Sequence, residues 1–262
     1  MSYADIHGEG EGIGPKLKRV GVFIAVLLII FVMMPAVLDG YRSFKIGSQM
    51  DFEMHGNVIH APLYDTFRDE FPAEYVEFRS RLAVMAREGA SNEQLSQFGF
   101  GYMRNFTLTK GEHLVAAPDG ALIELMKRNL ALVRALRDES LPLCAQMTAT
   151  GLQPGNTYSP PVQRRIISLS VQTLKSIAAG QQDPHPRGEV TQENVDSLYE
   201  ALVGTIPEQD ALAVINGMGF EALPLTNQCA AGLALYEAVG KLPEDASMRL
   251  TAAIIAPQPN AR

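Results

Sequence analysis

Hydrophobic side chains recur at intervals of three and four residues along most of the chain after residue 60. Only a helix brings side chains at this spacing onto one face. The clearest run starts at Asp119, and its apolar positions are Leu122, Met126, Leu130, Val133 and Leu136. The pattern predicts an all-α domain over residues 61–256, which could divide into halves at 61–150 and 160–256, and a frayed tail at 257–262.

Local signals mark the ends of several predicted helices. Ser91 followed by Gln94 matches a capping box, and Ser159-Pro160 is typical of a helix N-terminus. The helix after Ser159 has two apolar stripes, so we expect it to be central and to end at Gly180. The expected core includes Met126, Leu130, Val133, Ile166, Leu169 and Leu202. A short hairpin is expected within residues 106–117.

One stretch lacks any polar face. Val20–Leu38 is a run of 19 residues without a charged or strongly polar side chain, preceded by Lys16, Lys18 and Arg19. As a helix it would be roughly 28 Å long, close to the thickness of the bilayer core. A cleaved signal peptide is the alternative, but its apolar run is usually about 7–15 residues long and no small-x-small cleavage site follows here. We therefore expect an uncleaved transmembrane anchor at residues 16–38.

The basic residues beside the anchor predict its orientation. Lys16, Lys18 and Arg19 outnumber Arg42 and Lys45, which favours a cytoplasmic N-terminus and a periplasmic domain in a bacterial-type inner membrane. Residues 1–15 are rich in Gly and Glu and are expected to be a disordered tail. Residues 39–60 alternate apolar and polar side chains and form either a linker or an extension of the anchor helix.

The charge balance limits the classes of partner. The formal net charge is −7, and the three acidic and three basic residues before the anchor cancel, so the acidity belongs to the part after it. An acidic domain without a basic cluster argues against nucleic acid and against electrostatic binding to anionic lipid.

Cys144 and Cys229 are the only cysteines. Each falls in the first turn of a predicted helix, with Ser140 and Thr226 as candidate N-caps. An even number in an oxidising compartment favours a disulfide, whereas two buried free thiols are the alternative.

Residues with catalytic or metal-binding potential are sparse. The histidines have neither the spacing nor the neighbouring ligands of a metal site, and no nucleophile motif occurs. We therefore expect no metal and no cofactor.

Glu139 is the one candidate for a catalytic residue. Glu139-Ser140, followed by Ala145 and Gly151-Leu152-Gln153, resembles the motif of lysozyme-like murein transglycosylases over about 15 positions. The resemblance implies a general acid at Glu139, but the Met of that motif is missing, the spacing is short and Cys144 intrudes. The alternative is a charged residue at the exposed end of an amphipathic helix, without the burial that a catalytic acid needs.

The sequence thus favours a single-pass membrane protein whose helical domain binds a protein partner or an envelope component, as a scaffold or accessory protein. The alternatives are an envelope hydrolase that uses Glu139 and an accessory subunit of a larger membrane complex.

Overall fold

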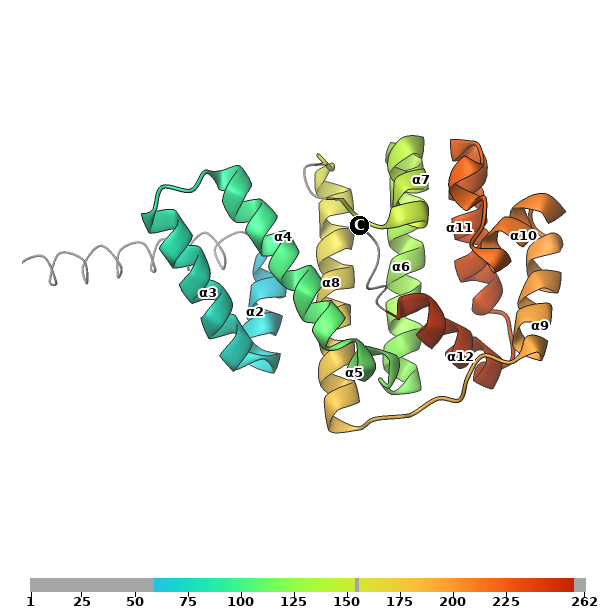
Figure 1. The fold of residues 1–262 in the computed structure, drawn as a ribbon, viewed down its shortest axis with the longest axis horizontal. Helices are drawn as coiled ribbons and strands as arrows, with labels where there is room; N and C mark the ends of the chain where they lie inside the picture. The colour runs from blue at the N-terminus through green and yellow to red at the C-terminus, as the bar shows by residue number, and fades with distance from the viewer. Residues whose placement is uncertain (1–58, 154–155, 257–262) are drawn as a thin grey trace, which may run out of the picture. The chain divides into compact units, whose positions relative to one another are not determined.

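The computed structural model describes residues 59–153 and 156–256, and every regular element in these ranges is a helix (Figure 1). The helices are α2 (Ala61–Glu70), α3 (Pro72–Arg87), α4 (Asn92–Thr109), α5 (Gly111–Val115), α6 (Asp119–Glu139), α7 (Leu141–Thr150), α8 (Pro160–Gln182), α9 (Gln192–Val203), α10 (Glu208–Asn216), the 3₁₀ turn η1 (Phe220–Ala222), α11 (Leu225–Val239) and α12 (Glu244–Ile255). The all-α class is therefore confirmed for the domain.

The expected anchor Val20–Leu38 lies outside the described residues, as do residues 1–19, 39–58 and the tail 257–262. Within residues 59–153 and 156–256, none of the helices has the length and apolar character needed to cross a membrane.

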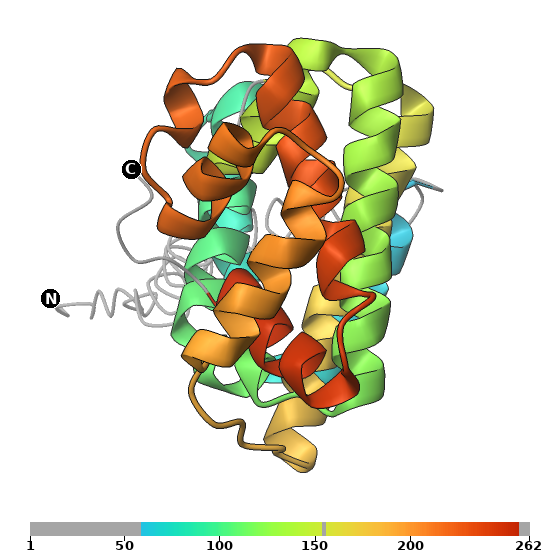
Figure 2. The same cartoon turned by 90° about the vertical axis from the view of Figure 1, so that its right-hand side faces the viewer.

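Helices α6 and α8 form the central pair of the domain (Figure 1). Helices α2 and α5 pack against α8, whereas α7, α11 and α12 pack against α6, and Figure 2 views the domain from the side of α9–α11. Two of the hydrophobic clusters contain residues from before position 151 and residues from after position 160. The segment 151–160 therefore connects two parts of the chain that pack into the same clusters.

Helix α6 contributes to all four hydrophobic clusters of the domain. Leu125 joins an aromatic-rich cluster formed with α2, α3, α4, α5 and α8. Met126 joins the cluster of α9–α12, and Val133 joins that of α7, α8 and α11. Leu122, fully buried, packs against Met248 and Ala252 of α12. Buried side chains thus point away from α6 in several directions, and the single predicted stripe is only part of its buried surface.

The predicted core is largely correct. Met126, Val133 and Leu202 are buried, whereas Leu130, Ile166 and Leu169 are half-buried members of the cluster formed by α6, α7, α8 and α11.

The predicted helix starts at Ser91, Ser140 and Ser159 are confirmed, whereas the one at Thr226 is wrong. Ser91 and Gln94 form the capping box of α4, Ser140 is the N-cap of α7, and Ser159 is the N-cap of α8. Thr226 is not an N-cap, because α11 begins at Leu225 after Pro224. Pro224, with a ψ of 146°, takes the N-cap position itself, so the helix begins before the threonine.

The hairpin expected within residues 106–117 is wrong. The chain continues as α4 to Thr109 and then forms α5, in which Gly111 and Leu114 are buried. Packing of α5 against α8 supplies the burial that a two-stranded hairpin would lack.

Gly180 does not end α8, which continues to Gln182. A β-carbon at position 180 would overlap the backbone carbonyl of His113 in α5. The glycine therefore permits α5 and α8 to approach closely. In the sequence, its position near the end of a helical pattern made it look like a helix stop instead.

Gly180→Ala should lower the free energy of unfolding by about 1–3 kcal/mol. The added methyl group would overlap backbone atoms of α5, so relieving the overlap requires a shift of the helix rather than of one side chain. Urea unfolding of the full chain in mild detergent measures this. Gly101→Ala in α4 is the matched control, because its methyl group would meet nothing within 4 Å. The control should be neutral or gain up to about 1 kcal/mol. Equal stabilities for the two variants would contradict the close approach.

Candidate functional site

Cys144 of α7 and Cys229 of α11 form a disulfide across the domain. Their α-carbons are 5.3 Å apart, within the range that a disulfide spans, and both side chains are buried. The pairing expected from the sequence is thus at bonding distance. It joins two helices that also pack closely, because a β-carbon at Gly232 of α11 would overlap the side chain of Thr148 in α7.

A groove of about 600 Å³ lies beside this junction, between α7, α10, η1 and α11. The walls of the groove include the apolar side chains of Ala149, Val214, Phe220 and Leu235, together with the polar residues Thr148, Glu221 and Tyr236. This volume is within the range of known ligand pockets, about 300–1,000 Å³.

A glycine-flanked turn forms one edge of the groove. Gly217 and Gly219 both have a positive φ, 62° and 79°, and both line the groove. Between them, Met218 is 76% exposed, the highest value among the large hydrophobic residues that the structure describes as exposed. The backbone geometry that glycine permits therefore holds an apolar side chain in solvent at the edge of the groove.

Tyr236 is one of the polar residues that line the groove. Its ring contacts two hydrophobic clusters, and its hydroxyl makes no hydrogen bond with the described part of the protein. Burial raises the pKa of this hydroxyl above its ordinary value of 10.0. At neutral pH it is therefore an uncharged group that can both donate and accept a hydrogen bond.

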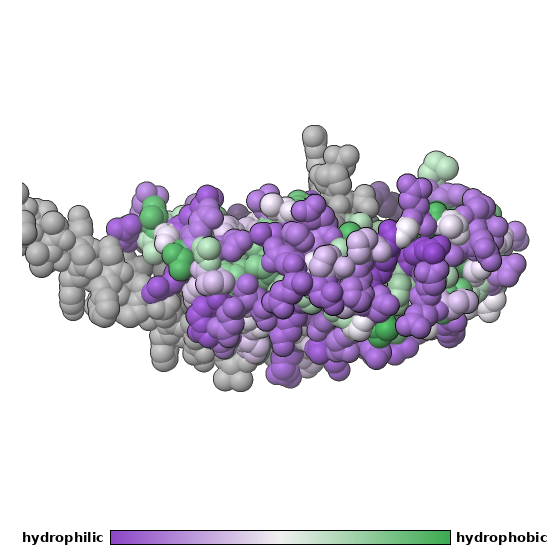
Figure 3. Space-filling model, turned by 90° about the horizontal axis from the view of Figure 1, so that it is seen from below, coloured by the Kyte–Doolittle hydropathy of each residue, from purple (hydrophilic) through white to green (hydrophobic). Residues whose placement is uncertain are grey.

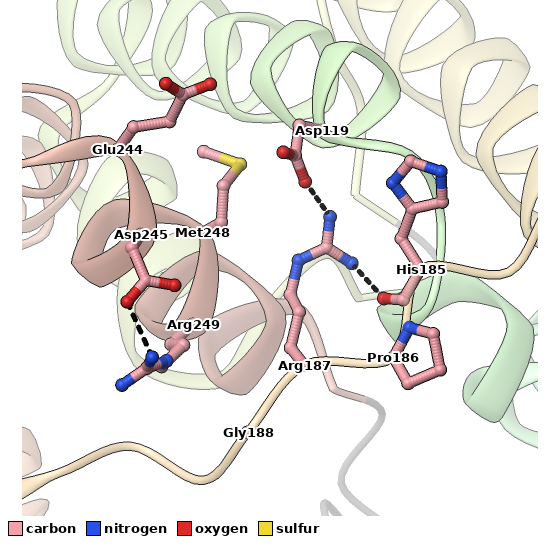
Figure 4. A pocket seen from close by; sticks show the side chains of 9 residues that line it. All are labelled: Asp119, His185, Pro186, Arg187, Gly188, Glu244, Asp245, Met248 and Arg249. Carbon is pink, nitrogen blue, oxygen red and sulfur yellow. Dashed lines mark hydrogen bonds and ion pairs between the residues drawn. The ribbon is translucent and has the colours of Figure 1, made fainter.

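A second cleft, of about 470 Å³, lies between the α8–α9 connection and the first turns of α6 and α12 (Figure 4). Its principal cation, Arg187, is already engaged. The guanidinium Nη1 donates to the backbone oxygens of Val115 (2.9 Å) and His185 (3.0 Å), and Nη2 pairs with Asp119. Arg187 thus links the α8–α9 connection to the junction of α5 and α6. Its contacts give this second cleft a structural role.

Glu139 has a structural role at the junction of α6 and α8. At the end of α6, it is exposed and accepts hydrogen bonds from the backbone N–H of Ser159, at 3.0 Å, and from the Ser159 hydroxyl. Ser159 is the N-cap of α8, where a carboxylate is favoured by the helix dipole. Glu139 lines neither the groove nor the second cleft.

Among the described residues, no group of three or more His, Cys, Asp or Glu side chains is arranged to hold a metal ion. Comparison of the chain with known protein families, curated proteins and solved structures finds no match.

Loss of the disulfide should destabilise the domain. Labelling of the denatured, unreduced protein should detect no thiol, and labelling after reduction should detect two per chain. The double variant Cys144→Ala with Cys229→Ala should lose at most about 4–5 kcal/mol, because the bridge closes a loop with a sequence separation of 85. Two thiols reacting before reduction would contradict the pairing.

Desolvation of the Tyr236 hydroxyl should make stability sensitive to alkaline pH. Above about pH 10 the phenol ionises in the unfolded chain before it does so in the folded protein, so the unfolded state binds fewer protons and stability falls as pH rises. Tyr236→Phe should remove this contribution and give a shallower loss between about pH 9 and pH 11. Urea midpoints measured across this range test the effect, and identical slopes for variant and wild type would exclude it.

Proposed function

We propose that the protein is a membrane-anchored binding module, in which a helical domain on the periplasmic side of an inner membrane docks a protein partner. The groove beside Tyr236 carries the proposal, because it combines apolar walls, an unused hydroxyl and the exposed Met218 at its edge. Apolar and aromatic side chains around a polar group are typical of the energetic centre of a protein interface.

The anchor and the disulfide support the location. The apolar run Val20–Leu38 has the length of a membrane span, and a disulfide between two buried cysteines suits an oxidising compartment. Attachment to the membrane would raise the effective concentration of the domain near membrane-embedded partners. The role that follows is that of a scaffold or accessory protein in the cell envelope.

Photo-crosslinking in intact cells tests the docking. A crosslinking phenylalanine analogue at Phe220, which lines the groove, should give one defined adduct with another protein in the membrane fraction. The same analogue at Val84, exposed on α3, is the control and should give none. Mass spectrometry of the adduct also gives the N-terminus, and the anchor predicts that residues 20–38 are retained. No protein adduct at position 220, or adducts of equal yield at both positions, would refute the docking.

A further inference from the structure

The charges of the domain are strongly segregated along the sequence. Between Gly188 and Gly240 there is no Lys, Arg or His, although the stretch contains eight carboxylates. The whole chain has a formal net charge of −7, so this stretch alone is more acidic than the entire protein. It forms α9, α10, η1 and α11, three of which line the groove.

Most of these carboxylates face solvent. Asp210 is buried and accepts a hydrogen bond from Asn227 Nδ2 at 2.8 Å, and Glu237 pairs with Arg134 at 2.7 Å. The other six are exposed: Glu189, Glu193, Asp196, Glu200, Glu208 and Glu221. Of the eight carboxylates, Glu221 lines the groove itself, and the others make the elements that form or adjoin it negatively charged.

Glu221 is the carboxylate of this stretch that lines the groove. It lines the groove from η1, is exposed, and its carboxylate has neither a hydrogen bond nor an ion pair with the part of the chain that the structure describes. By contrast, the carboxylate of Glu208 accepts a hydrogen bond from the Tyr199 hydroxyl at 3.0 Å. A cation approaching the groove would thus meet an unpaired carboxylate at its edge.

Exposed carboxylates alone serve solubility on many proteins. The hydroxyl of Tyr236 is an independent observation, because this half-buried residue lines the same groove and its hydroxyl has no hydrogen-bond partner among the described residues. A group in that position loses hydrogen bonds to water when the groove is filled, unless the occupant supplies one. An occupant that combines an apolar body, a hydrogen-bonding group and a positive charge would complement these groups.

We propose that the groove binds a basic, amphipathic polypeptide segment of a partner protein. An apolar side chain of the segment fills the space between Val214, Phe220 and Leu235. A backbone carbonyl of the segment accepts a hydrogen bond from Tyr236, and a Lys or Arg pairs with Glu221.

This inference rests on the proposed docking function and narrows the chemistry of the partner. A polypeptide suits the site better than an anionic lipid or a nucleic acid, because the acidic stretch would repel phosphates. The face of the domain in Figure 3 is mainly hydrophilic with scattered hydrophobic residues. The negative charge of the stretch would also speed association with a basic partner, an effect that weakens as salt is added.

Binding of a dye-labelled peptide of leucine and lysine, designed as an amphipathic helix, tests the proposal. The full chain is held in nanodiscs of phosphatidylcholine, and fluorescence anisotropy is compared with that of empty nanodiscs. The peptide should bind, and its analogue with glutamate in place of lysine should not. Binding of both peptides with equal affinity would overturn the proposal.

Three variants locate the binding. Glu221→Gln should weaken the affinity by about two- to fivefold, as expected for an exposed ion pair. Tyr236→Phe should weaken it by about two- to tenfold without lowering the melting temperature, because the hydroxyl makes no hydrogen bond that folding requires. Glu88→Gln at the end of α3 changes the charge by the same amount away from the groove and should leave the affinity unchanged. Equal weakening by Glu88→Gln and Glu221→Gln, or no effect of Tyr236→Phe, would overturn the groove as the site.

The crosslinking experiment separates failure of this inference from failure of the proposed function. If Phe220 crosslinks to a protein while the leucine–lysine peptide fails to bind, docking stands and the basic occupant is wrong. An adduct with lipid or with a second copy of this chain would likewise overturn the basic partner. An adduct whose crosslinked segment contains Lys or Arg beside apolar residues would support it.

Discussion

The position of α6 is the constraint on which the rest of the domain depends. One helix of 21 residues provides buried side chains for every hydrophobic cluster, from Leu125 among the aromatic residues to Leu136 beside the disulfide. Its apolar residues cannot all be buried unless α2–α5, α7–α8 and α9–α12 are in place at the same time. Packing of this kind makes unfolding cooperative, because loss of any one layer exposes part of α6.

Helix positions were predictable wherever local chemistry and packing agree. The capping box at Ser91 and the proline after Ser159 both act within one turn of the helix, so the sequence displays them directly. The errors at Gly180 and in the expected hairpin have a common cause. Helix α5 packs against α8 through a contact between residues far apart in the chain, and no local pattern reports such a contact.

The candidate site was harder to predict than the fold. The disulfide followed from the number of cysteines and the expected compartment, but the approach of α7 to α11 depends on Gly232 and Thr148, which do not form a recognisable motif. The groove depends on four elements and has no sequence signature. Two of its signals are nevertheless visible in the sequence: the paired glycines around Met218 and the stretch 188–240 without basic residues. Only the structure places Tyr236 beside them.

The disulfide also determines how the chain responds to proteolysis. Residues 145–228, which include all of α8, α9 and α10, lie within the covalent loop that Cys144 and Cys229 close. A protease cut in the connection after α8 or after α9 therefore leaves two fragments that stay joined until a reductant is added. A cut between α3 and α4 lies outside the loop and divides the chain into two separate polypeptides. The disulfide still links the two fragments after a single cut in the loop. The groove-lining residues of α10 and η1 therefore stay covalently connected to α7 and α11.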